Sequence, residues 1–153
     1  METRQTILEK LRDRLESHSW QTFGPTVFVG RTIFDPDSDP LPVLTIVPGL
    51  ESSERTRYGA DRIDMPCEVS ALVSLKDGRD VTELCEPIFA EIKQALFAPG
   101  QIEVESGDDP QYVSITYVGG GIADYPGEIG PAIVTIVVQV RLHFEQYIEQ
   151  NGG

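Results

Sequence analysis

The stretch PAIVTIVVQVRLHFE, from Pro131 to Glu145, decides the fold. Its residues fall into two alternating sets, because successive side chains of a β-strand point to opposite faces of a sheet. One set is apolar throughout and comprises Val134, Ile136, Val138, Val140, Leu142 and Phe144. The other set is mixed and comprises Thr135, Val137, Gln139, Arg141 and His143. The stretch is therefore predicted to be one long strand with one face in a hydrophobic core.

Other strands are predicted by the same reasoning. A second long one runs from Ile63 to Leu75, and its core-facing set is Ile63, Met65, Cys67, Val69, Ala71, Val73 and Leu75. Shorter strands are predicted at Thr26–Ile33, Leu41–Val47 and Gln111–Val118, with a possible further one at Gln101–Glu105. Between them lie Pro48–Asp61, which is polar and without period, and the glycine-rich Gly119–Pro131, and both are predicted to be loops.

Two helices complete the predicted elements. The first spans Glu2–Ser17, with an apolar stripe at helical spacing formed by Ile7, Leu8, Leu11 and Leu15. The second is capped by Asp80 and ends near Phe97, before Pro99-Gly100. The predicted fold class is α+β, a mostly antiparallel sheet with two helices packed on one face, in the order α-β-β-β-α-β-β. Its other face, partly apolar through Leu72, Val137 and Tyr112, is expected to remain for a partner.

Size and composition indicate a single soluble domain spanning residues 1–153. Of its 153 residues, 40% are hydrophobic and 24% charged, which is ordinary for a globular protein that buries its own core. No apolar run approaches the roughly 20 residues needed to span a bilayer. The first residues lead directly into an amphipathic segment without a secretory apolar core, so we expect the cytoplasm and no membrane partner.

The net charge of −13 is unevenly distributed. Gln94 to Val140 contains no Lys or Arg, whereas six acidic residues lie within it. An acidic surface repels phosphate, so stable nucleic-acid binding is disfavoured. The acidity has two explanations: it keeps the protein soluble, or it forms a surface past which DNA slides without sticking.

Candidate catalytic and metal-binding motifs are incomplete. Asp35, Asp37 and Asp39 resemble the start of a calcium loop, but the required glycine and glutamate are missing, so a turn is predicted. Glu91-Ile92-Lys93 matches the acid-x-lysine element of metal-dependent nucleases. That element belongs at the end of a strand, whereas this one lies within a predicted helix, so Glu91 and Lys93 are predicted to be solvated.

The remaining motifs also have simpler interpretations. Gly119-Gly120-Gly121 lacks the Lys-Ser or Lys-Thr of a phosphate-binding loop and is predicted to be flexible. Cys67 and Cys85 are predicted to be small buried hydrophobes. His18 and His143 have no acid, Cys or His at metal-ligand spacing. No cofactor, metal site or enzymatic activity is therefore expected.

Loop residues are the best candidates for function. The loops Pro48–Asp61 and Gly119–Pro131 each precede one of the two long strands. Long loops in a compact domain commonly bind partners, and Arg and Tyr are enriched in interfaces. The candidate interaction residues are Arg55, Arg57, Tyr58, Arg62, Tyr125 and Glu128.

The order of elements resembles the tail-terminator, or tail-completion, proteins of long-tailed bacteriophages, a family also called minor tail protein U-like. The resemblance rests on the opening helix, a Leu-Pro-Val-Leu-Thr-Ile strand, the long alternating strand, a capped Asp-Val-Thr-Glu-Leu helix and a closing strand ending in Val-Arg-Leu-His-Phe-Glu. It implies a structural virion protein that forms a six-fold ring at the head-proximal end of the tail tube. Such a ring ends tube polymerisation, contacts the tube and head-completion or connector proteins, and lets DNA pass through its lumen without specific binding. It implies no catalytic residues.

Three alternatives remain open at this point. One is another neck or connector protein of the same virion. Another is a metal-dependent hydrolase that uses Asp35, Asp37, Asp39 or Glu91. The third is a cytoplasmic small-ligand module with an enclosed apolar pocket between sheet and helices.

Overall fold

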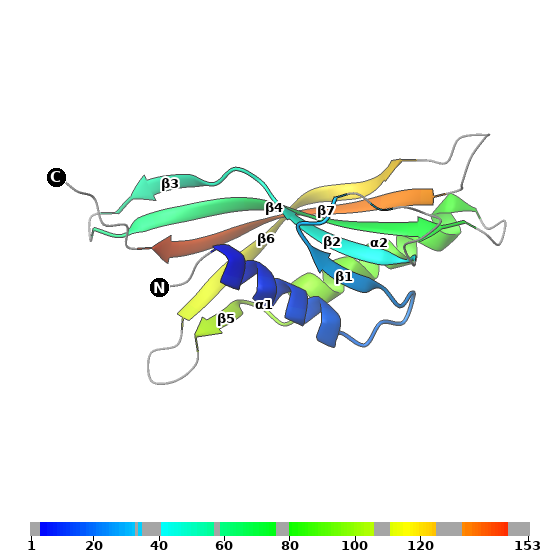
Figure 1. The fold of residues 1–153 in the computed structure, drawn as a ribbon, viewed down its shortest axis with the longest axis horizontal. Helices are drawn as coiled ribbons and strands as arrows, with labels where there is room; N and C mark the ends of the chain where they lie inside the picture. Colours follow the sequence, from blue (N-terminus) through cyan, green and yellow to red (C-terminus); the bar gives the residue numbers. More distant parts are fainter. Residues whose placement is uncertain are drawn as a thin grey trace.

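The computed structural model describes residues 4–32, 34, 41–56, 59–75, 80–105, 111–124 and 133–146. Within them lie two helices and seven strands, coloured along the chain in Figure 1. The helices are α1 (Arg4–Ser17) and α2 (Val81–Phe97). The strands are β1 (Thr26–Val29), β2 (Val43–Pro48), β3 (Ser52–Arg55), β4 (Asp61–Ser74), β5 (Ile102–Glu105), β6 (Gln111–Asp124) and β7 (Ile133–Gln146). The fold class is α+β.

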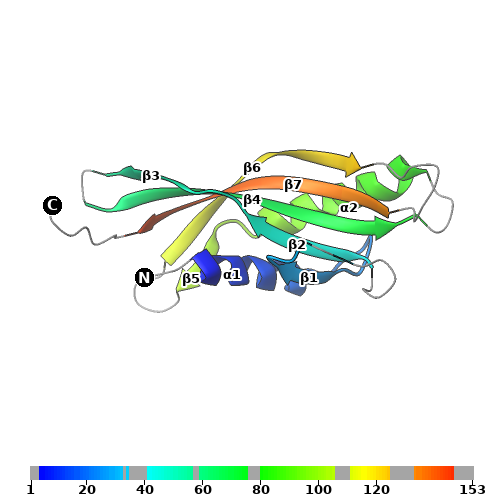
Figure 2. The same cartoon turned by 45° about the horizontal axis from the view of Figure 1, so that its top comes forward.

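The described strands form one mixed sheet. Their order is β1-β2-β4-β7-β6-β5, and β3 pairs with a further part of β4. β1 and β2 are parallel, whereas the other pairs are antiparallel. The prediction of a mostly antiparallel sheet is therefore wrong, because the sheet is mixed. A parallel neighbour needs a connection of roughly a dozen residues, and the segment between β1 and β2 has that length. The sheet curls strongly, so that β5 and the first half of β6 lie below β4 in Figure 2.

The two long strands predicted from alternation are neighbours at the centre of the sheet. β4 and β7 pair over their whole length, from Asp61 opposite Gln146 to Ser74 opposite Ile133. β6 lies on the other side of β7, so β7 is paired along both edges. The predicted core face of β7 is confirmed, since Val134, Ile136, Val138, Val140, Leu142 and Phe144 are all buried. On β4 the predicted face is buried from Ile63 to Val73, whereas Leu75 lies beyond the end of the strand and is only partly buried.

The core joins the sheet to both helices. The predicted stripe of α1 is buried in full, and it belongs to one hydrophobic cluster with the core-facing residues of α2, β4 and β7. α1 contacts β1 and β5, whereas α2 contacts β6 and β7. Each fully buried Leu or Ile of this cluster contributes roughly 1.5–3 kcal/mol of transfer free energy.

Side-chain hydrogen bonds determine how α2 begins and ends. Asp80 Oδ1 accepts a hydrogen bond from the backbone N–H of Thr82 at 3.1 Å, which is the predicted N-cap. At the other end, the Arg14 guanidinium donates to the carbonyl oxygens of Leu96, Gly100 and Gln101. A cation beside the last carbonyls of a helix is favourable because those carbonyls carry partial negative charge. Arg14 therefore ties α1 to the C-terminal end of α2.

The two predicted loops are partly strands. Ser52–Arg55 lies within the first of them and forms β3, all of whose residues are exposed. β6 continues through the three glycines to Asp124, six residues beyond the predicted end at Val118. At Gly120 a Cβ atom would lie 2.1 Å from the carbonyl oxygen of Val137, which is shorter than any contact between such atoms. The glycine therefore allows two backbones to approach inside the sheet.

Candidate functional site

A projecting arm is the feature of the fold that bears on function. It consists of residues 52–55 of β3, 61–66 of β4 and 141–146 of β7. Figures 1 and 2 show these strand ends extending beyond α1. A strand of 14 residues is about 45 Å long, whereas a helix of 14 residues measures about 21 Å, so the sheet must outreach α1.

The arm brings together two of the candidate interaction residues. Arg55 lies on β3 opposite Asp61, and Arg62 lies on β4 between Glu54 of β3 and Glu145 of β7. The Arg55 Nε atom is 3.8 Å from Oδ1 of Asp61. Arg62 is exposed. The surface therefore presents arginines between carboxylates, an arrangement suited to a partner with charges of both signs.

Asp61 is a buried carboxylate that the sequence did not indicate. The residue is 5% exposed, and within the described part of the chain its Oδ2 atom has no hydrogen-bond partner. A buried acceptor without a partner costs about 1–3 kcal/mol. The positive charge of Arg55 therefore offsets part of the cost of burying the Asp61 carboxylate.

Four candidate interaction residues lie outside the described residues: Arg57, Tyr58, Tyr125 and Glu128. The same is true of Asp35, Asp37 and Asp39. Whether these residues join the arm, a metal site or neither therefore stays a prediction. Within the described residues, no three or more His, Cys, Asp and Glu side chains gather as ligands for a metal ion.

A second polar cluster lies on the sheet face opposite the core. Arg141 Nη1 is 3.2 Å from Asp64 Oδ2, and His143 Nδ1 is 3.7 Å from Asp64 Oδ1. On the other side of the imidazole, His143 Nε2 is 3.1 Å from the hydroxyl oxygen of Thr116. Hydroxyl, imidazole and carboxylate thus stand in one row across β6, β7 and β4. The Nδ1–Oδ1 separation is longer than a hydrogen bond, whereas Arg141 donates a hydrogen bond to Asp64 Oδ2.

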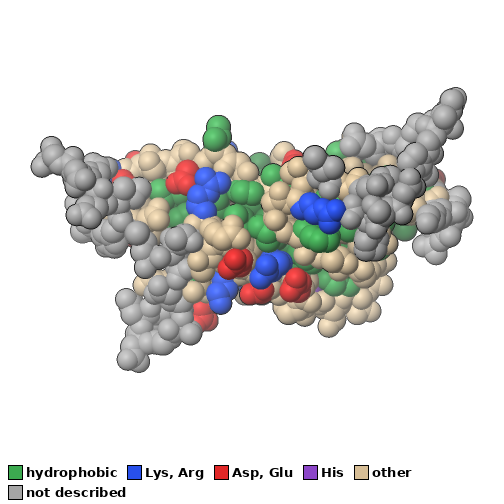
Figure 3. Space-filling view, viewed as in Figure 1, with side chains coloured by type: hydrophobic (Ala, Val, Ile, Leu, Met, Phe, Trp, Pro, Cys, Tyr) green, Lys and Arg blue, Asp and Glu red, His purple; other side chains and the backbone are tan. Residues whose placement is uncertain are grey.

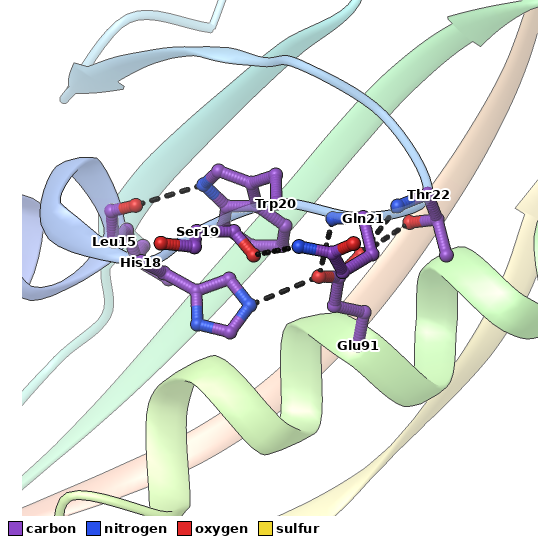
Figure 4. Close-up of polar contacts among 7 residues, drawn as sticks. All are labelled: Leu15, His18, Ser19, Trp20, Gln21, Thr22 and Glu91. Carbon is purple, nitrogen blue, oxygen red and sulfur yellow. Dashed lines mark hydrogen bonds and ion pairs between the residues drawn. The ribbon is translucent and has the colours of Figure 1, made fainter.

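Glu91 is the most strongly bound carboxylate of the described residues, and its predicted place on a solvated helix face is wrong. It is 7% exposed and faces the segment that follows α1 (Figure 4). Its Oε1 accepts hydrogen bonds from the backbone N–H of Thr22 at 2.8 Å and from the Thr22 hydroxyl at 2.6 Å. Its Oε2 accepts from the backbone N–H of Gln21 at 2.7 Å and lies 3.0 Å from Nε2 of His18.

These contacts determine the protonation state of Glu91. Burial alone raises the pKa of this carboxyl group, because it disfavours the charged form. The hydrogen bonds from Thr22, Gln21 and His18 outweigh burial, and together they lower the pKa to about 2. Glu91 is therefore a charged anchor that holds the segment 18–22 to α2. A catalytic acid or base is expected to titrate near the working pH, and Glu91 does not.

One sequence signal could have located Glu91. It follows Ile88 by three positions and precedes Ala95 by four, and both of these residues are buried. The helical period therefore places Glu91 on the core side of α2. Its donors lie about seventy residues earlier in the chain, and no spacing rule connects them.

The other candidates have structural roles. Lys93 Nζ is 4.4 Å from the centre of the Phe89 ring and 5.3 Å from that of Tyr117, so it makes cation–π contacts. Cys67 and Cys85 are buried free thiols, as predicted. Burial raises the pKa of Cys67 to about 12.

The surface over α1 has mixed charge. Figure 3 shows acidic and basic side chains interspersed there. Arg12 is 3.5 Å from Asp13 and 3.9 Å from Glu16. Exposed pairs of this kind stabilise a helix only slightly, so these contacts contribute little to the stability of the fold. Neither described helix combines the length and hydropathy that crossing a lipid bilayer requires.

No protein-family model matches the chain, and no curated protein matches it.

Proposed function

We propose that this chain is a structural virion protein of a long-tailed bacteriophage. Copies of it form a ring, six-fold as in tail terminators, that caps the head-proximal end of the tail tube. The ring ends polymerisation of the tube protein and joins the tail to the head-completion or connector protein. In this proposal the whole chain is one domain whose helices cover one face of the sheet, and it resides in the virion after assembly in the host cytoplasm. It has no enzymatic role.

The arm is the observation that supports the proposal best. A ring subunit must reach its neighbours and the tube, and the strand ends of β3, β4 and β7 project beyond α1. Because the arm belongs to a hydrogen-bonded sheet, it is more rigid than a loop of the same reach. Its exposed Arg62 and Arg55 are residues of the kind that anchor interfaces.

The charge distribution supports the passage of DNA through such a ring. No Lys or Arg occurs from Gln94 to Val140, a stretch that includes β5, β6 and half of β7. A lumen lined by this part of the chain would offer phosphate no Lys or Arg and would not retain the genome. In this proposal β5 and β6 face the lumen, while the arm faces protein partners.

The test is a capping assay with the tail-tube protein of the same phage. The purified chain is added to polymerising tube protein, and tube lengths and tube ends are measured by electron microscopy. We expect shorter tubes with a ring at one end. Arg62→Glu should weaken capping by roughly tenfold, since charge reversal at an anchor costs about 1.4 kcal/mol or more. Lys10→Glu, the same charge change on the exposed face of α1, should cap as the wild type does.

Each outcome bears on a different part of the proposal. Unchanged tube lengths without density at either end would refute tail termination. Binding to the connector protein but not to the tube would assign the chain to the neck instead. Full capping by Arg62→Glu would show that the arm is not the surface in contact with the tube.

A further inference from the structure

A hydroxyl, an imidazole and a carboxylate meet where the arm adjoins β6. Thr116 Oγ1 is 3.1 Å from His143 Nε2, and His143 Nδ1 is 3.7 Å from Asp64 Oδ1. Asp64 and His143 are directly opposite one another in the β4–β7 register, and Thr116 lies diagonally across from His143 on β6. Thr116 is exposed, and the His143 side chain is 34% exposed. The hydroxyl and the imidazole are therefore both accessible from solvent.

The surroundings of His143 determine which of its ring nitrogens carries the proton. A neutral imidazole has one N–H donor and one nitrogen that accepts. Asp64 Oδ1 is shielded from solvent, and no described residue donates a hydrogen bond to it. This oxygen favours the proton on Nδ1, because the other tautomer would set a nitrogen lone pair against a carboxylate oxygen. Nε2 is then the acceptor, and the Thr116 hydroxyl donates to it.

A second contact holds the carboxylate in place. Arg141 Nη1 donates to Asp64 Oδ2 at 3.2 Å, which leaves Oδ1 for the imidazole. A hydroxyl that donates to a base, which a third group orients in turn, is the arrangement of an activated nucleophile. Asp64 acts only through His143 and is a positioning residue. The arrangement therefore makes Thr116 more reactive than an ordinary exposed threonine.

We propose that Thr116 is an acylation site, whose hydroxyl takes an acyl group from small activated donors such as aryl esters, thioesters and acyl phosphates. Oγ1 of Thr116 forms a bond to the carbonyl carbon of the donor, and the hydroxyl proton passes to Nε2 of His143. The bond from that carbon to the leaving oxygen or sulfur breaks, and the leaving group departs with the electron pair. Nε2 then returns the proton to the leaving group or to water.

The product is an ester on Thr116 and the free leaving group, formed once per chain. The modification requires neither a second copy of the chain nor the tail tube. It therefore holds or fails independently of the capping assay, and it extends the proposed function with a reactive position on the arm's border.

The first test is labelling of the purified full chain with p-nitrophenyl acetate at pH 8, followed by peptide mass spectrometry. Thr26 is the internal control, because it is an exposed threonine of β1 and both histidines of the chain have other partners. Thr116 should gain one acetyl group roughly a hundredfold faster than Thr26, since a positioned base typically contributes about 100-fold to 10,000-fold. His143→Gln should lower the rate at Thr116 to about that of Thr26. Thr116→Ser keeps the hydroxyl and should retain the labelling.

The second test is nitrogen NMR of the His143 ring at pH 8, which requires no substitution. The proton should lie on Nδ1 in the wild type. Asp64→Asn offers the ring an amide donor, so it should move the proton to Nε2 and slow acetylation of Thr116. A wild-type ring protonated on Nε2 would overturn the proposal. Acetylation confined to other residues would also overturn it, as would labelling of Thr116 that His143→Gln does not slow.

Discussion

Replacing Glu91 with glutamine should destabilise the fold without changing its shape. Glutamine keeps one acceptor oxygen for the two hydrogen bonds from Thr22. Its amide nitrogen then takes the place of Oε2, where the backbone N–H of Gln21 now donates. Two donors face each other there, and the contact with His18 loses its charged acceptor.

The expected loss follows from the structure by two routes. Hydrogen bonds to a charged group contribute about 1.5–3 kcal/mol each, and the variant weakens two of them, which gives roughly 3 kcal/mol or more. A pKa lowered from 4.5 to about 2 corresponds, at ~1.4 kcal/mol per pKa unit, to a similar roughly 3 kcal/mol. Glu91→Gln should therefore lower the free energy of unfolding by about 3 kcal/mol at neutral pH.

The loss should depend on pH in a defined direction. The pKa of Glu91 is lower in the folded than in the unfolded chain, so its contribution is fully present above about 4.5 and declines as the pH falls toward about 2. The wild type should lose this contribution over that range, whereas glutamine does not titrate. The stability difference between wild type and variant should therefore shrink from about 3 kcal/mol toward zero.

Urea unfolding followed by Trp20 fluorescence measures this difference. Trp20 is the single tryptophan of the chain, and it lies in the anchored segment, where its Nε1 donates to the carbonyl of Leu15. Titrations at pH 7, 5, 4 and 3 give the free energy of unfolding of both proteins. Glu86→Gln, at an exposed position of the same helix, is the control and should be nearly neutral. Equal stability of Glu91→Gln and wild type at pH 7, or a difference independent of pH, would refute the reasoning.

Three further predictions concern packing and chemical reactivity. Gly120→Ala should destabilise the fold by more than about 2 kcal/mol because its Cβ meets the carbonyl of Val137, whereas Gly24→Ala, with no atom within 4 Å, should change the unfolding temperature little. Ile136→Ala should cost about 2–5 kcal/mol in urea unfolding, and Val137→Ala, on the opposite face of β7, less than half as much. Native Cys67 should resist iodoacetamide at pH 8 and react once urea unfolds the chain, as mass spectrometry can show, because its thiol is buried and its pKa is raised to about 12. Fast labelling of the native thiol would contradict its burial.

Alternation and helical spacing were sufficient for the central elements. The core face of β7, that of β4 as far as Val73, and the stripe of α1 were predicted residue by residue, because a period of two or of 3.6 is a local property of the sequence. β3 was missed because Ser52–Arg55 is polar on both faces and pairs only as an exposed edge. The second half of β6 was missed because its glycines suggested a loop, although Gly120 is needed where two backbones meet.

The remaining features depend on contacts distant in sequence. The parallel pairing of β1 with β2 cannot be predicted from the sequence of either strand, because the relative orientation depends on the path of the segment that connects them. The buried state of Glu91 depends on donors about seventy residues away. Of the candidate interaction residues, Arg55 and Arg62 were chosen as loop residues, and pairing of β3 with β4 placed them on the same arm.

The position of β7 has a consequence for how the molecule is built. β7 lies between β4 and β6 in the sheet, but it is the last of the described elements in the chain. β4 and β6 therefore become part of one sheet only when β7 pairs with both of them. Until β7 is in place, the apolar faces of β4 and β6 are not joined into one continuous core surface. The sheet should therefore form cooperatively and only after the last strand is available. Because most of its contacts join residues far apart in the sequence, folding should be slow. A chain cut before Ile133 should yield two half-sheets prone to aggregation instead of a smaller stable protein.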